Sequence, residues 1–276
     1  MLWDLDGTMI DSEPIWWEVE RELFDENGGV WTQELAESLV GHNLRDSAKH
    51  LIAQFDRHDI DPDELVADMV VRVERHFRSG VTWQPGVLRL LTELSEAGIP
   101  MAIVTASYRS LVEALLTHLP GANFKAIISG DDVLRGKPDP EPYLNAAAAL
   151  GVDPRECVAI EDSLAGAASA QSAGCYVLAI PHVVSPPPAP RRTVVASLAG
   201  IEVDDFRRLL REACSALDRL PSRLIRCARA RYKARSRNHQ RCKAGRSSPR
   251  PRELQPLTSS PSRRGVTLRP SRRSRR

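Results

Sequence analysis

Four short stretches of this sequence carry side chains that could do chemistry together. The first, DLDGT, places Asp4 and Asp6 on either side of one apolar residue, directly before Gly7 and Thr8. The other three supply a hydroxyl, an ammonium group and two more carboxylates: Thr105 after MAIV, Lys137 in GKPDP, and Glu161 and Asp162 after VAI. Carboxylates that gather in one place cannot be buried in ionised form without a cation, and their hard oxygen atoms favour Mg²⁺.

Two neighbouring carboxylates beside Mg²⁺ suit phosphoryl transfer. The metal would neutralise the charge of a phosphate group, while one carboxylate attacks phosphorus and forms an aspartyl-phosphate. A second carboxylate two residues further on, held away from the metal, can act first as an acid and then as a base. Thr105 and Lys137 would hold the phosphate oxygens, and Gly7 permits the tight turn that brings backbone amides towards the phosphoryl group.

Strands that alternate with helices are expected to position these residues. Short apolar runs rich in β-branched residues predict strands at 101–105, 125–129, 156–161 and 175–180. Helical patterns occupy 86–97, 108–118, 140–150 and 164–173, and a final helix is predicted at 204–218 after a proline-rich loop at 186–190. This order predicts an α/β fold with a Rossmann-like parallel sheet and helices on both faces. Ligands bind at the carboxyl ends of such strands, so the four stretches should converge on one site.

Residues 13–80 interrupt this alternation. They contain amphipathic helical segments and no convincing strand, which predicts a small α-helical cap inserted after the first strand. We therefore expect an α/β core formed by 1–12 and 81–219, a helical cap at 13–80, and a separate C-terminal segment at 220–276.

The C-terminal segment has a composition of its own. From Leu220 onward there are 17 arginines and two lysines against a single acidic residue, Glu253. Its lack of apolar periodicity predicts a disordered tail, because it cannot bury enough surface to offset its ordering entropy. Three interpretations stay open: a spurious extension such as a frameshift product, an inert tail, or a basic arm that binds nucleic acid. We expect no nucleic-acid partner, since aromatic residues are not interleaved with the arginines.

The remaining composition indicates a cytoplasmic protein without a membrane partner. No run of 18 apolar residues appears, and the N-terminus lacks the pattern of a secretory signal. The five cysteines form no CxxC pair and have no metal-site spacing, so reduced thiols are expected. We also expect a monomer.

The four stretches also carry a family resemblance. DLDGT, the threonine at the end of the second strand, GKPDP and VAIEDS stand in the order of the four motifs of the haloacid dehalogenase-like superfamily, which residues 1–219 resemble. The helical insert resembles the small cap of the beta-phosphoglucomutase-like phosphatases. Taken singly, each residue has a structural explanation, such as a helix cap for Thr105. Their joint occurrence is what indicates the family.

The resemblance implies a role for each motif residue. Asp4 would be the nucleophile, Asp6 the general acid and base, and Thr105 and Lys137 the phosphate-binding residues. Mg²⁺ would be held by the Asp4 carboxylate, the Asp6 backbone carbonyl and Asp162, with Glu161 ligating through water or orienting the other ligands. Asp6 also argues against a dehalogenase, because dehalogenases of the superfamily carry a different residue at this position.

The implied function is a Mg²⁺-dependent phosphatase that hydrolyses a small phosphomonoester, with sugar phosphates as the leading class. Residues that could contact the substrate are Ser107 and Arg109 after the second motif, and His42, Asn43 and Arg45 in the cap loop LVGHNLRDS. A sugar phosphomutase is the alternative, but such mutases usually carry a histidine and an arginine where this chain has Trp16 and Leu44. A second alternative is a weakly catalytic protein that binds nucleic acid through its basic tail.

The first strand is unusually short in the sequence. Only Met1, Leu2 and Trp3 precede Asp4, whereas a buried strand normally has four to eight residues. One hypothesis is that the native start lies upstream of Met1. If it does not, the centre of the sheet should be poorly supported.

Overall fold

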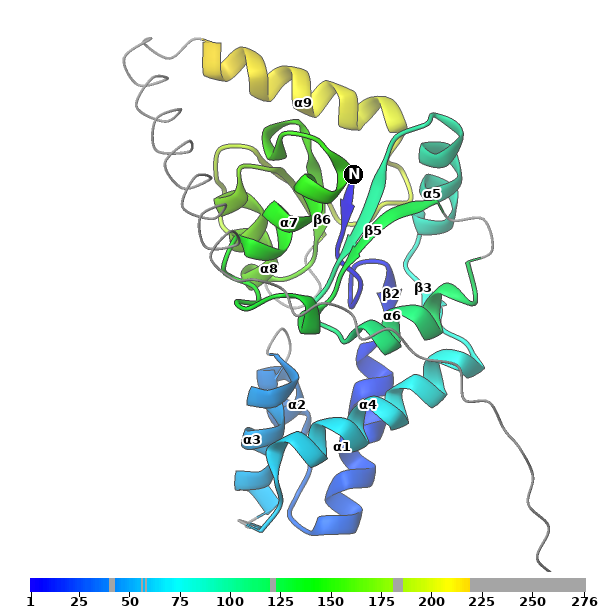
Figure 1. Cartoon of the computed structure of the whole chain (residues 1–276), viewed down its shortest axis with the longest axis vertical. Coiled ribbons are helices and arrows are strands. Elements are labelled where there is room, and N and C mark those ends of the chain that lie inside the picture. The colour runs from blue at the N-terminus through cyan, green and yellow to red at the C-terminus, as the bar shows by residue number, and fades with distance from the viewer. Residues whose placement is uncertain (40–42, 56, 58, 120–122, 181–185, 219–276) are drawn as a thin grey trace, which may run out of the picture. The chain divides into compact units, whose positions relative to one another are not determined.

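A parallel sheet with six strands forms the centre of the described part of the chain (Figure 1). The computed structural model describes residues 1–39, 43–55, 57, 59–119, 123–180 and 186–218. The strand order is β5-β4-β1-β6-β7-β8, with bounds β1 Leu2–Trp3, β4 Met101–Val104, β5 Phe124–Ile128, β6 Val158–Glu161, β7 Tyr176–Ala179 and β8 Arg192–Val194. The predicted α/β class with a parallel sheet is confirmed. Strand β8, which follows the proline-rich loop, was not predicted, because RTV is too short to show a pattern.

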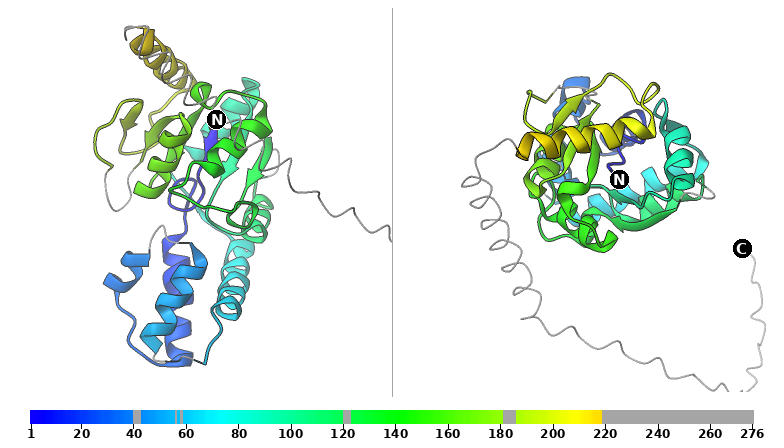
Figure 2. Two further views of the ribbon diagram at one scale, coloured as in Figure 1. Left: turned by 60° about the vertical axis from the view of Figure 1, so that its left-hand side comes forward. Right: turned by 90° about the horizontal axis from the view of Figure 1, so that it is seen from above.

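Helices cover both faces of the sheet (Figure 2). Side chains of α7 (Glu141–Leu150) and α8 (Leu164–Ala173) pack in one hydrophobic cluster, which is rich in alanine. Side chains of α5 (Val87–Glu96), α6 (Arg109–Leu116) and the start of α9 (Val203–Asp218) pack in a second cluster. Two short 3₁₀ helices, Gly130–Asp132 and Pro154–Glu156, precede α7 and β6 respectively. The alternating order of strands and helices therefore builds the layered core that the sequence predicts.

Strand β1 lies in the middle of the sheet although it has two residues. Leu2 pairs with Ala102 and Ala159 of the neighbouring strands, and Trp3 lies one step further along both. Successive side chains of a strand point to opposite faces, and so Leu2 joins the alanine-rich cluster while Trp3 joins the other. Both side chains are fully buried. A two-residue strand thus contributes one large apolar side chain to each core.

Four helices form the insertion after the first strand: α1 Glu13–Asn27, α2 Gln33–Leu39, α3 Leu44–Phe55 and α4 Pro62–Ser79. A short antiparallel pair, β2 Ile10–Asp11 and β3 Thr82–Trp83, brackets the insertion where the chain leaves and re-enters the core. This pair was not predicted. It brings the two connecting segments together at the base of the cap.

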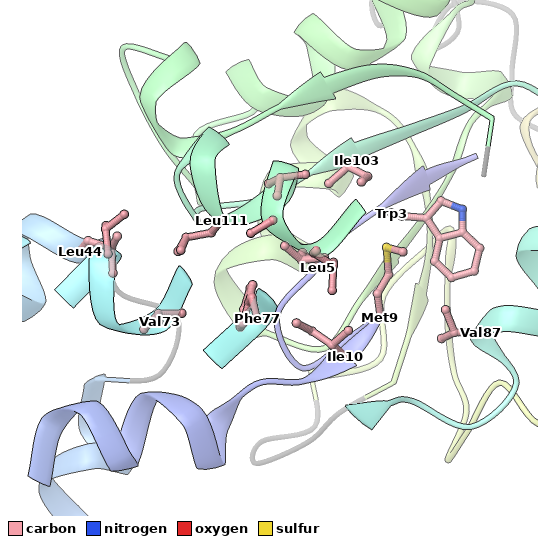
Figure 3. Close-up of a cluster of buried hydrophobic side chains, with 14 of the residues drawn as sticks. Trp3, Leu5, Met9, Ile10, Leu44, Val73, Phe77, Val87, Ile103 and Leu111 are labelled. Atoms are coloured by element: carbon pink, nitrogen blue, oxygen red, sulfur yellow. The ribbon is translucent and has the colours of Figure 1, made fainter. Parts of the chain in front are cut away.

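A continuous hydrophobic cluster joins the cap to the core. Figure 3 shows Leu5 and Ile10 of the core beside Phe77 and Val73 of α4, with Leu44 of α3 further along. Phe77 and Val73 are fully buried although they belong to a surface-inserted helix. Because this packing fixes the base of α4 against the core, the cap helices stand at the carboxyl-terminal edge of the sheet. Among the described residues, no helix is long and apolar enough to cross a bilayer.

Candidate active site

The chemistry-bearing residues follow the carboxyl ends of four neighbouring strands. Asp4 follows β1, Thr105 follows β4, Lys137 lies in the segment after β5, and β6 ends at Glu161 and Asp162. The side chains of Asp4, Thr105, Glu161 and Asp162 are buried, with Glu161 fully enclosed and Asp4 exposed to 5%. The Lys137 side chain is 6% exposed, and Asp6 is half-buried. The parallel sheet therefore does what the sequence pattern predicts, since it brings the four stretches to one edge.

The Lys137 ammonium group bridges two of the carboxylates. It donates to Asp4 Oδ1 at 2.5 Å and to Glu161 Oε1 at 2.6 Å. Tyr143, on α7, donates its hydroxyl to the same Glu161 oxygen, and Ser163 donates to Glu161 Oε2 at 3.2 Å. Both oxygens of Glu161 are therefore engaged by side chains of the protein.

The buried carboxylates of this cluster carry more negative charge than the Lys137 ammonium can neutralise. Burial and the neighbouring Glu161 carboxylate raise the pKa of Asp4 to about 7, although Lys137 opposes the shift. Burial also raises the pKa of Asp162 well above its usual range, with further contributions from Asp4 and Glu161. Burial alone would lower the pKa of Lys137, but the two carboxylates that it contacts raise it. The ammonium group thus stays charged and neutralises only part of the cluster.

The same cluster has the composition of a cation site. Oxygen atoms of Asp4, Glu161 and Asp162 all lie within 4.8 Å of one another, and each residue is buried. Thr8 donates to Asp162 Oδ1 at 3.3 Å and so helps to orient that carboxylate. Three converging buried carboxylates are a set of hard oxygen donors that Mg²⁺ would relieve of their mutual repulsion.

The Asp6 carboxylate is held between the cap and the core. Ser12 donates to its Oδ1 at 2.8 Å, and the Trp16 indole N–H approaches the same atom at 3.5 Å. From the core side, Ser107 donates to Oδ2 at 2.6 Å and Thr105 at 3.2 Å. Asp6 is therefore directed away from the Lys137 cluster, which is the separation expected of a proton-transfer group that does not bind the metal.

Two glycines have no side chain where one would overlap the Asp162 and Glu161 carboxylates. Gly7 has φ +76°, and a Cβ atom there would lie 2.1 Å from Asp162 Oδ2. A Cβ atom at Gly166, in the first turn of α8, would lie 1.9 Å from Glu161 Oε2. Because no contact this short is tolerated, both positions require glycine for the carboxylates to stay where they are.

Gly166→Ala is expected to lower both activity and stability, even though alanine is the better helix former. The new methyl group would displace the Glu161 carboxylate and with it the Lys137 ammonium. We expect a loss of about 1–3 kcal/mol in the free energy of unfolding and at least about tenfold in kcat, measured by urea denaturation and by phosphate release. Gly200→Ala, where a Cβ atom meets nothing within 4 Å, is the control. Equal behaviour of the two variants would contradict the steric explanation.

A cavity of about 130 Å³ opens above the cluster. Its core wall includes Asp4, Asp6, Thr105, Lys137 and Asp162. The cap contributes the other wall, formed by residues of α1 to α4: Glu13, Trp16, Trp17, Glu20, Ala36, Leu39, Leu44, Ser47 and Met69. The cavity is mostly apolar on the cap side, so a phosphate on the core wall would present its organic group to the cap.

The residues expected to contact the substrate divide into two groups. Ser107 lines the cavity. Arg109, Arg45 and Asn43 are not among the described lining residues: Arg109 pairs with Asp132 at 2.5 Å, Arg45 with Asp63 at 2.9 Å, and Asn43 hydrogen-bonds Asp46 at 2.7 Å. His42 lies outside the described residues. A substrate contact through any of these stays a prediction.

Several residues of the site could not be recognised in the sequence. Tyr143 lies in an alanine-rich helix and looks like an ordinary core residue, yet its hydroxyl contacts Glu161. Ser12 ends the predicted core segment 1–12 and Trp16 lies in the predicted cap, and only the folded chain brings them both to Asp6. The spacing DxxxxxS between Asp6 and Ser12 was the one available signal, and it is too common to be diagnostic.

Comparison with known proteins adds an independent finding. The sequence profile of the haloacid dehalogenase-like hydrolases matches residues 1–180. Hexitol phosphatase A of Escherichia coli K12 is 35% identical over 183 residues, which cover 65% of this chain and 81% of that protein. Validoxylamine A 7'-phosphate phosphatase of Streptomyces hygroscopicus subsp. limoneus is 32% identical over 180 residues, 65% of this chain and 84% of that protein. The crystal structure of CbbY from Rhodobacter sphaeroides in complex with phosphate has a TM-score of 0.64 and 28% identity, and the match covers 72% of this chain and 94% of that chain.

Proposed function

Because this chain belongs to the haloacid dehalogenase-like hydrolases, we propose that it uses Mg²⁺ and an aspartyl-phosphate on Asp4 to hydrolyse a small phosphomonoester of the sugar phosphate class. Its phosphatase relatives make the chain a phosphoric monoester hydrolase. The metal, the covalent intermediate and the substrate class are our proposal beyond that activity.

One observation carries the proposal. The Asp4 carboxylate lies at the base of a cavity, buried, in contact with Lys137 and beside two further carboxylates. A carboxylate in this place can attack a phosphoryl group, because the ammonium at 2.5 Å would offset the negative charge that the phosphate brings. Thr105 at the end of β4 lines the same wall and would hold a second phosphate oxygen.

The residues present fit a magnesium ion. Asp4 and Asp162 would hold it together with the Asp6 backbone carbonyl, and Glu161, whose oxygens are already engaged, would orient Lys137 and the other ligands. When bound, the ion would neutralise phosphate charge and align the phosphoryl group with its attacker.

The side chains of the protein support a two-step reaction. In the first step, Asp4 attacks phosphorus, the bond between phosphorus and the leaving oxygen breaks, and Asp6 donates a proton to that oxygen. In the second step, Asp6 takes a proton from a water molecule, which attacks phosphorus and releases inorganic phosphate and the free Asp4 carboxylate. Asp6 lines the cavity beside Asp4 and does not contact Lys137, which suits a group that moves a proton.

The direct test is phosphate release from p-nitrophenyl phosphate and a panel of sugar phosphates. We expect turnover with Mg²⁺, loss of turnover with a chelator, and recovery when Mg²⁺ is returned in excess. A folded chain that releases no phosphate under any of these conditions would overturn the proposal.

Mg²⁺ should also stabilise the fold, and more so at higher pH. The pKa of Asp4 is raised from 3.8 to about 7 in the folded chain, so the folded state retains a proton that the unfolded state has lost between these pH values. Stability without metal therefore falls as pH rises through this window. We expect Mg²⁺ to raise Tm little at about pH 5.5 and by several degrees at about pH 8. A matched ionic strength of NaCl is the control, and an equal shift at both pH values would contradict the cation site.

We also propose that the protein acts in the cytoplasm on a small phosphorylated molecule. Two of its cysteines, Cys157 and Cys175, are buried as free thiols in the described part of the chain, which agrees with a reducing compartment. A monomer stays the expectation, since one chain supplies every residue that the proposed chemistry uses.

A further inference from the structure

The cap wall of the cavity contains two buried polar side chains that the proposed chemistry does not use. They are Glu20 of α1 and Ser47 of α3, both buried, with exposed fractions of 5% and 6%. Around them the cap wall is mostly apolar, with Trp16, Trp17, Ala36, Leu39, Leu44 and Met69, and the partly buried Glu13 is its other charged residue. Polar groups set in an apolar wall fix the orientation of a ligand and select among ligands.

Glu20 is held rigidly and still has bonding capacity left. The Trp31 indole N–H donates to Glu20 Oε2 at 3.1 Å. Trp31 is itself fixed between Trp17, with ring centroids 6.4 Å apart, and the Arg21 guanidinium, 4.1 Å from its ring. Within the described residues, neither Glu20 Oε1 nor the Ser47 hydroxyl has a hydrogen-bond partner.

An unpaired carboxylate oxygen in an apolar wall calls for a donor from the ligand. Burial raises the pKa of Glu20, whereas the Trp31 hydrogen bond lowers it. A carboxylate can only accept hydrogen bonds, so its natural complement is a hydroxyl group, and the Ser47 hydroxyl can both donate and accept. Leaving such groups without a partner costs free energy that a hydroxylated ligand would recover.

The negative charge of the cavity disfavours ligands that carry a second anionic group. Among the described lining residues, Lys137 is the one cationic side chain, and it is already shared by Asp4 and Glu161. Five of the lining residues are acidic: Asp4, Asp6, Glu13, Glu20 and Asp162. A second phosphate or a carboxylate on the leaving group would meet Glu20 with no free cation among the described lining residues to pair with, and like charges repel. The Arg21 guanidinium, whose charge also acts on Glu20, packs over Trp31 and is not one of these lining residues.

We propose that Glu20 and Ser47 make the cap wall select a leaving group that carries hydroxyls and no second anionic group. The substrates would then be monophosphates of polyols or sugars, and bisphosphates and phosphorylated acids would be rejected. Glu20 acts as the specificity residue through its charge and its open oxygen. This inference rests on the proposed phosphatase function and names the substrate class of the same site.

The test compares substrates that differ by one charged group. Fructose 6-phosphate is paired with fructose 1,6-bisphosphate, and glycerol 3-phosphate with 3-phosphoglycerate, at about pH 8 where a carboxylate is ionised. We expect the wild-type chain to prefer the first member of each pair by at least about tenfold in kcat/KM. In Glu20→Gln, KM for the hydroxylated substrates should rise about tenfold, and the preference should fall by a similar factor because the repulsion is gone.

Two controls separate specificity from folding and from chemistry. In Glu20→Gln, kcat/KM for p-nitrophenyl phosphate should change much less than kcat/KM for the hydroxylated substrates, because its leaving group has no hydroxyl to bond Glu20. Glu18→Gln, the same substitution at an exposed position of α1, should leave every ratio as in the wild type. If the wild type hydrolyses the aryl phosphate but prefers the bisphosphate, or if Glu20→Gln leaves the ratios unchanged, the inference is wrong. If the folded wild type hydrolyses none of these compounds, the proposed function fails first.

Discussion

Asp4→Asn is expected to stop phosphate release almost completely, with a fall of about 10⁴-fold or more in kcat. Asparagine has the shape of aspartate and its amide oxygen can still accept a hydrogen bond from Lys137, but it cannot form an aspartyl-phosphate. In the second step of the proposed reaction there would be no intermediate for water to attack. The loss should therefore appear in kcat with every phosphomonoester, whatever its leaving group.

The fold of this variant should survive, which is what makes the result interpretable. Burial and Glu161 raise the pKa of Asp4 to about 7, so at about pH 8 the wild-type chain holds a carboxylate that its surroundings disfavour. A neutral side chain removes that repulsion, and Tm of Asp4→Asn without metal should equal or exceed that of the wild type. Asp25→Asn, on the exposed face of α1, is the matched control and should keep full activity. A folded Asp4→Asn chain with more than about 1% of wild-type kcat would exclude Asp4 as the nucleophile.

Residues whose positions follow from strand order could be placed from the sequence. Asp4, Thr105, Glu161 and Asp162 each follow a short apolar run, and a parallel sheet aligns the ends of such runs without any knowledge of side-chain packing. Lys137 could be placed because the segment after β5 returns to that same edge. The α/β class follows from the same alternation, and these features depend on local patterns and on one topological rule.

Features that depend on packing between distant segments could not be predicted from the sequence. The β2–β3 pair joins residues more than seventy positions apart, and nothing in either two-residue strand indicates its partner. The structure brings the Trp16 indole N–H to Asp6, a contact that the helical pattern of residues 13–80 does not indicate. Glu20 lay unnoticed in a helix rich in charge, because a helical pattern does not tell which of several glutamates the fold will bury. The cap wall, on which the proposed selectivity rests, is therefore visible only in three dimensions.

The short first strand shows how packing can replace length. Two residues cannot form a strongly patterned strand, and the sequence suggests a weak centre for the sheet. In the structure Leu2 and Trp3 pair with a strand on each side, and each is fully buried in a different hydrophobic cluster. Burial of two large side chains on opposite faces contributes about 1.5–3 kcal/mol each. The strand is therefore anchored through its neighbours and does not depend on its own propensity.

Lys137→Met should affect stability as well as activity, because the ammonium is the one cation among the described residues of the buried cluster. Its removal leaves Asp4, Glu161 and Asp162 without the charge that partly neutralises them, and breaking a buried ion pair from one side costs about 3–5 kcal/mol. Methionine has a similar volume, so the loss cannot be assigned to a cavity. We expect this decrease in the free energy of unfolding at about pH 8, measured by urea denaturation without metal, and a loss of at least about 10³-fold in kcat.

The pH dependence of that loss separates charge from packing. When lysine is absent, the remaining carboxyls can become neutral only by binding protons, so the folded state of Lys137→Met takes up protons that the wild type does not. The deficit in stability should therefore shrink as pH falls from about 8 to about 5.5, and Mg²⁺ should reduce it at the higher pH by returning positive charge to the cluster. Arg135→Met removes a cation two residues away whose side chain is 64% exposed, and should change stability little at either pH. A deficit that is the same at both pH values and indifferent to Mg²⁺ would mean that Lys137 supports the fold by packing, and would remove the electrostatic basis proposed here for phosphate binding.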